Sequence, residues 1–499
     1  MLASPVQYLS LFSHRSAMNQ TLQSARQEQA EWAAVPIQER LRKVRVFRGL
    51  LADRAEELGA AIDLPERSLL AETLSSEILP LAGACQFLEA NAKAILRSTT
   101  SGRFRGLMPG GISVRVERSP WGLVLVVCAG NYPIFLPGVQ AIQALVAGNA
   151  VLLKPAPGTA DVVAALAEML VEAGFHPDLL IVLDEASESA QRVMAVGVDK
   201  VLFTGSSDTG RAVLSQLADT LTPATLELSG CDSVFVHPDA DLGLLVDALR
   251  FGLTFNGSAT CIAPRRVFVT EERAAELEES LEALIREVGP VRLTPDRSRK
   301  LQAQVLGALR QGARLVGPGM QFSEESKPVV LADVRPKMDV ARTDLFAPLV
   351  SIMSVKDFAE ALELDRQCPY SLGASVFGPP KAANDWAARI HAGVVVINDM
   401  IAPTADPRVP FGGRGESGFG VTRGGEGLLE LTQPKTLMQR NGRWRPHFQT
   451  LEHGDEALFE SLMRAKHDKN WRRRTRAWLD LAGAVRRKAR QVSENRGGA

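Results

Sequence analysis

LVLVVCAGNYPIFLPGVQAIQALVAGNAVLLKPA occupies residues 123–156 and decides the fold class. Its two ends, LVLVVCA (123–129) and AVLLKP (150–155), are continuous apolar runs typical of strands buried on both faces, and PGVQAIQALVAG (137–148) between them is helix-like. The alternation continues with a helix at 159–174, LLIVLD (179–184), KVLFTG (200–205), a helix at 209–221 and ATLELSG (224–230). This order predicts βαβ units and an α/β fold whose parallel sheet is covered on both faces. Ligands of such sheets bind beyond the carboxyl ends of the strands.

The flanking sequence extends this pattern in both directions. Residues 18–100 are mostly helical in pattern, and ISVRVER (112–118) alternates with period two, which indicates a solvent-facing strand. A second α/β region follows, with helices at 241–254 and 272–288 and strand candidates at 265–270, 348–355, 371–378 and 393–399. The Gly-rich stretch VPFGGRGESGFGVTRGGEG (409–427) predicts an ordered loop.

The composition is that of a globular protein. The 499 residues are 45% hydrophobic and 23% charged, which excludes a disordered or collagen-like chain and suggests two to four domains. Lys and Arg balance Asp and Glu at 57 each, but the balance hides an asymmetry. Residues 440–499 carry 15 basic and 7 acidic side chains, a net charge of +8, so residues 1–439 carry −8.

The cysteines give no support for a disulfide framework or a metal site. Five cysteines are scattered without CxxC spacing, and no histidine pair has metal-ligand spacing on a helix. The N-terminus lacks the basic region and long apolar run of a secretory signal, and no apolar run approaches the roughly 20 residues that span a bilayer. We therefore predict a cytoplasmic, reduced protein without a bound metal.

Three local features suggest chemistry, although each also has a plain structural interpretation. KVLFTGSSDTGRAV (200–213) has the pattern of a strand, a turn and a helix. The N-terminus of this helix either binds a phosphate or belongs to a plain αβ turn without a ligand. Glu227 in TLELSG is either a functional buried carboxylate or, as we favour from this segment alone, a strand-end side chain pointing to solvent. Cys261 in NGSATCIAP is either a nucleophile or an inert small hydrophobe.

Taken together, the motifs resemble those of the aldehyde dehydrogenase superfamily over roughly residues 20–440. Lys154 lies 23 residues after Asn131, and Cys261 lies 34 after Glu227, as in the family. The wording NYP, LTPATLEL and TCIAP is most similar to the branch that handles fatty and aromatic aldehydes. The matching segments, in family order, are GNYP (130–133), LVAGNAVLLKPA (145–156), FTGS (203–206), LELSG (226–230), the Cys261 segment, DLFAPL (344–349) and PFGG…SGFG (410–420).

The resemblance implies an architecture. N-terminal helices and a Rossmann-type cofactor domain would span residues 1–226, interrupted by an oligomerisation β-hairpin near 108–122. A catalytic α/β domain would span 227–400, the chain would return to the cofactor domain and an oligomerisation strand over 401–445, and a basic helical tail would span 446–499.

The resemblance also implies the site residues. Cys261 would be the nucleophile that forms a thiohemiacetal and then a thioester, and Glu227 the general base. The Asn131 amide and the Cys261 N–H would form the oxyanion hole. For NAD or NADP, Lys154 would bond the adenosine ribose and Gly205 with Ser206 would face the pyrophosphate. On the nicotinamide side, Asp344 would hold the ribose and Phe346 would line the site.

Several positions depart from the family pattern. Pro157 stands where many NAD-preferring members have Glu, which removes a charge that repels a 2′-phosphate. Asp344 is one methylene shorter than the usual Glu, and Ala347 replaces Gly. ELGGK reads ELSGC with Ser229 and Cys231, and the usual GQ reads Ser258-Ala259. Since Cys261, Glu227, Asn131 and Lys154 are all present, altered specificity or slow turnover is a better interpretation than inactivity.

The sequence thus predicts an NAD(P)-dependent aldehyde dehydrogenase that makes a carboxylic acid from an apolar, fatty or aromatic aldehyde. Tyr132, Phe135, Thr260 and Ile262 are candidates for the wall of an apolar tunnel. The family also implies a homodimer or homotetramer. The alternatives are a CoA-acylating relative, which the retained Glu227 disfavours, and a non-catalytic scaffold recruited through its basic tail.

The segment 455–491 is helix-like and basic, with Trp471, Trp478, Leu481 and Val485 beside many arginines. Such a helix contacts a membrane surface or a protein partner, or packs on its own oligomer with its charges solvated. No recognition motif supports nucleic-acid binding.

Overall fold

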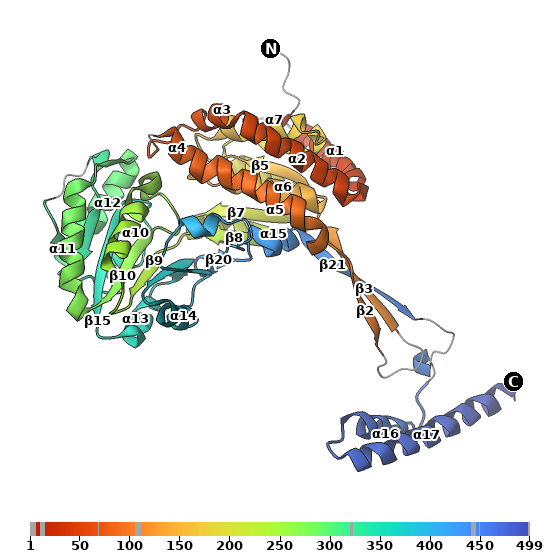
Figure 1. Cartoon of the computed structure of the whole chain (residues 1–499). Coiled ribbons are helices and arrows are strands. Elements are labelled where there is room, and N and C mark those ends of the chain that lie inside the picture. The colour runs from red at the N-terminus through yellow and green to blue at the C-terminus, as the bar shows by residue number, and fades with distance from the viewer. Residues whose placement is uncertain are drawn as a thin grey trace. The chain divides into compact units, whose positions relative to one another are not determined.

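The computed structural model describes residues 6–9, 15–67, 69–104, 112–319, 323–440, 446–448 and 450–497. The chain divides into two compact units, Met1–Arg97 with Arg118–Pro434 and Ser98–Glu117 with Lys435–Ala499. The first unit holds two seven-stranded sheets with their covering helices (Figure 1). Among the described helices, none is long and apolar enough to cross a bilayer.

The first sheet has the strand order β1-β6-β5-β4-β7-β8-β20. Its pairs are parallel except β8 with β20, where Gly418 lies opposite Glu227. The central strands are buried along nearly their whole length, which explains their continuous apolar sequences. The strands are β1 (Gln7–Leu9), β4 (Leu123–Val127), β5 (Ala150–Lys154), β6 (Leu180–Leu183), β7 (Lys200–Gly205), β8 (Ala224–Leu228) and β20 (Gly418–Phe419).

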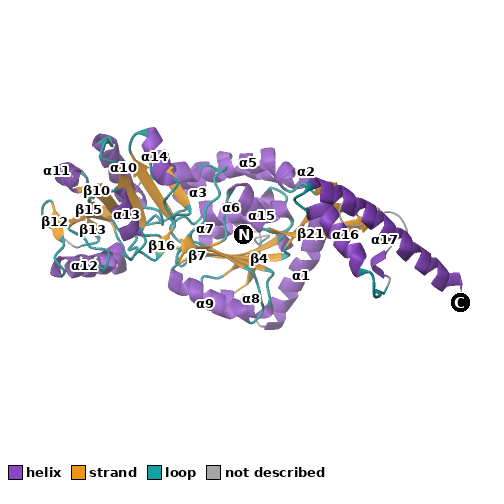
Figure 2. Cartoon of the chain, turned by 90° about the horizontal axis from the view of Figure 1, so that it is seen from below, coloured by secondary structure: helices purple, strands orange, loops and turns teal. Residues whose placement is uncertain are grey.

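Helices cover both faces of this sheet (Figure 2). α6 (Phe135–Ala147) is buried at every residue, because it lies between β4 and β5 on one side and α5 (Leu79–Ile95) on the other. Figure 2 shows α8 (Ser187–Val196) and α9 (Ser207–Ala218) on the face opposite α5 and α6. The remaining helices around this sheet are α1 (Arg15–Ala34), α2 (Ile37–Asp53), α3 (Ala55–Ala60), α4 (Leu70–Thr73), α7 (Ala160–Glu172) and α15 (Gly424–Glu430).

The second sheet has the order β12-β14-β15-β10-β9-β17-β18 and is parallel except at β12–β14. Its main strands are β9 (Asp232–Val236), β10 (Pro264–Thr270), β12 (Arg314–Val316), β14 (Val329–Ala332), β15 (Leu349–Val355), β17 (Gly373–Phe377) and β18 (Val394–Ile397). Its helices are α10 (Leu242–Thr254), α11 (Glu271–Glu287), α12 (Pro295–Arg310), α13 (Phe358–Asp365) and α14 (Pro380–Ala387).

The second unit contains a three-stranded sheet and two helices. β2 (Thr99–Phe104), β3 (Ile112–Pro120) and β21 (Thr432–Arg440) form the sheet in the order β2-β3-β21, with β2 and β3 antiparallel. Residues 105–111, which include the start of the predicted hairpin, lie outside the described residues. The helices are α16 (Glu456–His467) and α17 (Trp471–Gly497).

The predicted α/β fold with parallel sheets is confirmed. The sequence analysis did not find β1 or β9, and it treated 455–491 as one helical stretch. The helix instead ends at His467 and a new one begins at Trp471, because Asp468 has extended backbone that stops the first helix.

Candidate active site

Cys261 and Glu227 lie on the wall of one cavity of about 280 Å³ in the first unit. Cys261 follows the last turn of η3 (Phe255–Ser258), and Glu227 comes from the carboxyl half of β8. The rest of the wall is mostly apolar and aromatic. It includes all four predicted tunnel residues, and its members besides Cys261 and Glu227 are Ser75, Ser76, Tyr132, Phe135, Leu136, Phe251, Phe255, Thr260, Ile262, Ile401, Ala402, Thr404, Ala405, Phe411 and Arg423.

An unusual turn presents the thiol. Asn256, Gly257 and Ser258 have φ values of 51°, 56° and 60°, so three consecutive residues adopt the left-handed region. The Ser258 hydroxyl donates to the Gly252 carbonyl oxygen at 3.0 Å, which anchors the turn to α10. Gly230 must be glycine here, since a Cβ at that position would lie 2.4 Å from the carbonyl oxygen of Cys261.

Asn131 lies beside this turn. Its amide nitrogen donates to the carbonyl oxygen of Ala259 at 2.9 Å, two residues before Cys261. The Asn256 amide donates to the same oxygen at 3.1 Å. An amide nitrogen has two hydrogens, so Asn131 retains one donor after this bond.

Glu227 is buried, with 3% of its surface exposed, and the interpretation of a solvent-pointing strand end is wrong. The reason is β20, which pairs with β8 and covers the strand end with residues almost 200 positions later. The Thr422 hydroxyl donates to Oε2 at 3.0 Å, and Oε1 has no hydrogen-bond partner among the described residues. Burial raises the pKa of Glu227, while Arg423 and Thr422 lower it.

Arg423 is a functional candidate that the sequence analysis missed. Its side chain is buried on the cavity wall, with its guanidinium carbon 4.1 Å from the ring centre of Phe411 and 5.5 Å from that of Phe135. It donates to the Thr404 carbonyl oxygen at 2.8 Å, and its Nε is buried without a described partner. The only sequence signal was a single cation after the SGFG glycines, which does not distinguish a buried arginine from a surface one.

The surroundings of Cys261 keep its thiol protonated at rest. Burial raises its pKa well above that of a free thiol, the carboxylates of Glu227 and Asp232 raise it further, and Arg423 opposes them. A reaction at this sulfur therefore needs a base, and Glu227 is the carboxylate on the same cavity wall.

A buried ion pair, which the sequence analysis did not identify, holds the backbone around Asn131 and the turn before Cys261. Arg67 bonds Glu77 at 2.6 Å, with both side chains at most 1% exposed. Arg67 also donates to the Asn131 carbonyl oxygen at 2.6 Å and to the Asn256 amide oxygen at 2.8 Å. Glu77 in turn accepts the N–H groups of Ile134 and Phe135 at the start of α6. One pair thus holds both Asn131 and the turn before Cys261.

Three of the expected cofactor residues lie at the carboxyl ends of β5 and β7 or directly after them, and these two parallel strands flank β4. Lys154 ends β5, and its ammonium group forms no hydrogen bond with the residues that the structure describes. Burial lowers the pKa of Lys154, and Glu185 and Asp184 nearby oppose this. Gly205 ends β7, and Ser206 caps α9 by accepting the Thr209 N–H at 3.3 Å. A buried ammonium without a described partner and the N-terminus of α9 fit a nucleotide's ribose and pyrophosphate.

Asp344 and Phe346 lie together on a turn, but Asp344 already has a cationic partner. Its Oδ1 accepts from Arg265 Nε and from the Phe346 N–H, both at 2.9 Å, whereas Oδ2 is buried without a described partner. Arg265 also donates to the Ser258 hydroxyl and carbonyl oxygens, at 2.8 and 2.7 Å. Asp344 is therefore tied to the turn that carries Cys261.

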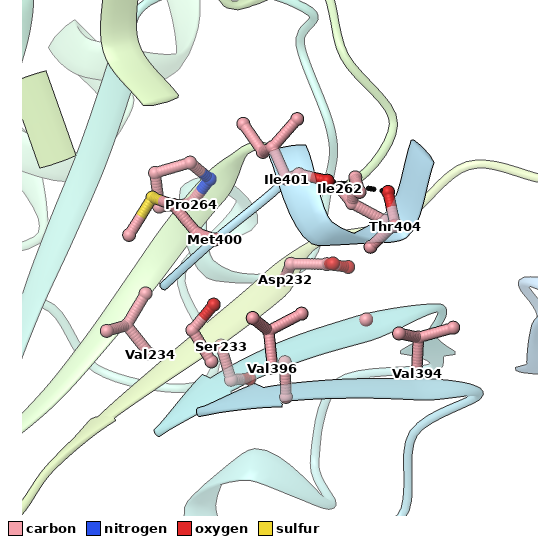
Figure 3. Close-up of a pocket in the computed structure, with 13 residues that line it drawn as sticks. Asp232, Ser233, Val234, Ile262, Pro264, Val394, Val396, Met400, Ile401 and Thr404 are labelled. Carbon is pink, nitrogen blue, oxygen red and sulfur yellow. Dashed lines mark hydrogen bonds between the residues drawn. The ribbon is translucent and has the colours of Figure 1, made fainter. Parts of the chain in front are cut away.

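A second buried carboxylate lies behind the site. Asp232 faces a small cavity of about 10 Å³, room for one water molecule, between the second sheet and the segment of Ile401 and Thr404 (Figure 3). Its Oδ1 has no partner in the described part of the chain, and burial raises its pKa well above the usual value. The wall shares Ile262, Ile401 and Thr404 with the Cys261 cavity. Cys231, the preceding residue, is buried, and so is Cys368.

Comparison with known proteins identifies the family. The sequence model described as "Aldehyde dehydrogenase family" matches residues 12–437. The chain belongs to the aldehyde dehydrogenase family. It is 30% identical to a 4,4'-diapolycopene aldehyde oxidase of Methylomonas sp, over 87% of this chain and 85% of that protein. It is 31% identical to a benzaldehyde dehydrogenase [NAD(+)] of Pseudomonas putida, over 82% of this chain and 85% of that protein.

The fold agrees with solved members of the family. The crystal structure of an NAD-dependent aldehyde dehydrogenase from Sinorhizobium meliloti matches with a TM-score of 0.81 and 27% identity, over 88% of this chain and 89% of that one. The family reaction is the oxidation of an aldehyde to a carboxylic acid with NAD or NADP, so the predicted enzyme class and cofactor class are confirmed.

Proposed function

We propose that this chain oxidises an apolar, fatty or aromatic aldehyde to its carboxylic acid through a covalent bond to Cys261. The observation that carries the proposal is the meeting of Cys261 with the unpartnered Oε1 of Glu227 on one largely apolar cavity. Phe135, Phe251 and Phe255 on its wall favour an apolar substrate. The carotenoid and aromatic aldehydes in the names of the two relatives also support this class.

In the first half of the reaction, Glu227 accepts the thiol proton and the Cys261 sulfur attacks the carbonyl carbon. A C–S bond forms while the π electrons of the carbonyl move to its oxygen. The remaining N–H of the Asn131 amide and the Cys261 backbone N–H stabilise this oxyanion. Bound NAD(P)+ would supply a hydride acceptor, and loss of the hydride from this carbon would leave a thioester on Cys261.

In the second half, Glu227 releases its proton to solvent and then removes one from a water molecule. The resulting hydroxide adds to the thioester carbon, the C–S bond breaks, and Cys261 leaves as a thiolate while the carboxylic acid is released. The unpartnered Oε1 supports this step, because it is an acceptor free to bond water. It also favours hydrolysis over transfer of the acyl group to CoA.

For the cofactor, we propose that Lys154 bonds the adenosine ribose and that Gly205 and Ser206 face the pyrophosphate. Asp344, through its unpartnered Oδ2, would accept from the nicotinamide ribose, with Phe346 lining that side. Pro157 supports tolerance of NADP as well as NAD, because no carboxylate occupies that position.

The proposal includes an assembly and a location. We propose a homodimer or homotetramer that joins through the β2–β3 hairpin and β21, in the cytoplasm, with the basic tail contacting a membrane surface or a protein. We also propose four functional segments. They are the N-terminal helices and cofactor domain (1–226), the catalytic domain (227–400), the return to the cofactor domain with the oligomerisation strand (401–445) and the basic helical tail (446–499).

The test is aldehyde-dependent reduction of NAD or NADP by the purified chain, with short, long and aromatic aldehydes. Signal that requires Cys261 and favours the apolar aldehydes supports the proposal. Acid release without added CoA distinguishes hydrolysis from acyl transfer. Aldehyde-dependent signal that persists in Cys261→Ala would contradict it.

A further inference from the structure

α16 and α17 form an antiparallel helical hairpin. The three residues between them reverse the chain, and Arg474 Nε lies 3.4 Å from the Ala465 carbonyl oxygen while Lys488 bonds Asp455 at 2.7 Å. Figure 1 shows the two helices side by side. Ala465, Ala477 and Ala484 are buried between them, so small side chains let the helices approach closely.

One face of this hairpin is apolar and exposed. On α17, Trp471, Trp478 and Val485 lie about a quarter to a third of a turn beyond the inward-facing alanines. On α16, Phe459 and Met463 lie between about a third and a half of a turn beyond Ala465 in the same sense. Because the helices are antiparallel, these two sides form one face, which we call the hairpin face. Its members are Phe459, Met463, Trp471, Trp478 and Val485, which are 41–68% exposed.

Cations lie within and behind the hairpin face. Lys466 and Arg474 lie on the same side of the hairpin as the tryptophans, about a quarter turn or less beyond the inward-facing alanines. Arg473, Arg476 and Arg487 point to the opposite side and form no ion pair with any described side chain. Between residues 456 and 488 there are 10 Lys and Arg against 4 Asp and Glu.

This combination selects one kind of partner. Two copies of the hairpin face would bring Lys466 and Arg474 of both chains together in an apolar contact, where like charges repel. An anionic bilayer accommodates both features: tryptophan and phenylalanine enter the acyl boundary, and arginine and lysine reach the phosphates. A helix with an apolar face and an arginine-rich opposite face lies in the plane of such an interface.

We propose that the hairpin face docks on an anionic phospholipid surface, with Trp471 and Trp478 in the acyl boundary and Lys466 and Arg474 on the phosphates. This inference is independent of the proposed reaction. Activity on a water-soluble aldehyde should be unchanged when the docking fails, so the two failures are distinguishable.

The full chain is tested by co-sedimentation with vesicles of phosphatidylcholine alone or mixed with phosphatidylglycerol. Binding to the mixed vesicles should be at least about tenfold tighter, and salt should weaken it. Phosphatidylcholine brominated in its acyl chains, added to the mixed vesicles, should quench the tryptophan fluorescence of the unmodified chain. No binding to either vesicle, or equal binding to both, would overturn the proposal.

Two pairs of variants locate the contact. Trp471→Ser with Trp478→Ser should weaken binding about tenfold or more. Leu479→Ser, which is 75% exposed on the side of α17 opposite α16, should weaken it much less. Lys466→Gln with Arg474→Gln should weaken it more than Arg473→Gln with Arg476→Gln, which removes the same charge from the opposite side. Equal losses within either comparison would contradict docking through this face. Sedimentation velocity must show the same oligomeric state for the parent and the tryptophan variant, since a change would assign the face to a second copy instead.

Discussion

Thr422→Val tests whether Glu227 is the base and what sets its proton affinity. Thr422 is 4% exposed, and its hydroxyl donates to Glu227 Oε2 at 3.0 Å. Valine has nearly the same shape but no donor. The backbone hydrogen bonds between Thr422 and Phe411, at 2.7 and 2.8 Å, do not involve the side chain and should remain.

The expected effect follows from the charge of the acceptor. A hydrogen bond to an ionised group contributes about 1.5–3 kcal/mol, so losing it makes the buried carboxylate harder to ionise by that amount. Because burial already raises the pKa of Glu227, the variant raises it further in the same direction. Glu227 must be ionised to accept a proton, so the acidic limb of kcat/KM should move to higher pH.

At pH values below the limb, kcat/KM should fall roughly ten- to hundredfold, and well above the limb it should match the parent. The assay is initial-rate NAD(P)H formation across pH with a single apolar aldehyde. Thr432→Val is the matched control: Thr432 is 5% exposed, but its hydroxyl donates to the Leu429 carbonyl oxygen, at 2.8 Å. The Thr422 hydroxyl also lies 3.3 Å from the Phe411 carbonyl oxygen. An unchanged pH profile in Thr422→Val would mean that the Thr422 hydroxyl donates to the Phe411 carbonyl and not to Glu227, and it would refute the reasoning.

Four further changes test other parts of the site. Cys261→Ala should abolish aldehyde-dependent NAD(P)H formation without altering cofactor affinity, as measured by fluorescence titration; residual turnover would exclude a covalent route through this sulfur. Lys154→Met should weaken cofactor binding about ten- to hundredfold in calorimetry, since a charge-assisted bond contributes about 1.5–3 kcal/mol, and unchanged binding would remove Lys154 from the ribose site. Glu77→Gln should lower the free energy of unfolding, measured in urea, by about 3–5 kcal/mol, because Arg67 loses its buried counter-ion. A loss below about 1 kcal/mol, which is typical of a solvent-exposed ion pair, would contradict this. The pKa of Asp232 is higher in the folded than in the unfolded chain, so the stability of the fold should fall as pH rises from the unfolded pKa to the folded one. Asp232→Asn should flatten this decline, and parallel Tm–pH curves for the parent and the variant would count against it.

The sheet that carries Lys154 and Gly205, the proposed cofactor residues, could be predicted because its sequence pattern is local. LVLVV, AVLLK and LIVL are buried on both faces, so each is continuously apolar, and the helices between them have the length that joins parallel strands. β1 escaped prediction because it is three residues long and takes its partner, β6, from more than 170 positions away. The division of 455–491 into two helices depends on one extended residue, Asp468, which apolar periodicity does not mark.

The sequence proposed candidate residues for the site but not their surroundings. Ordered motifs pointed to Cys261 and Glu227, but the burial of Glu227 depends on β20 and Thr422, which only the folded chain brings beside it. Likewise, Arg67 is an ordinary surface residue by its local sequence and becomes a buried anchor through Glu77 and Asn131. Partners so distant leave no periodic signal, because hydrophobic patterning reports which face of an element is buried and not which charge it meets there.

Glu227 and Arg423 show why both kinds of information are needed. An ionised carboxylate in an apolar cavity is costly without a counter-charge, and so is a buried guanidinium. Each lowers that cost for the other, since Arg423 lowers the pKa of Glu227 and Glu227 raises that of Arg423. The same guanidinium lowers the pKa of Cys261, so it favours both the ionised carboxylate and the thiolate that the proposed reaction requires. The guanidinium of Arg423 lies over the rings of Phe411 and Phe135, and one of its N–H groups donates to the Thr404 carbonyl oxygen. These contacts fix a buried positive charge on the wall of an apolar cavity. Arg423 therefore lets an apolar cavity hold the two groups of the proposed proton transfer, because its fixed positive charge favours the ionised forms of both Glu227 and Cys261.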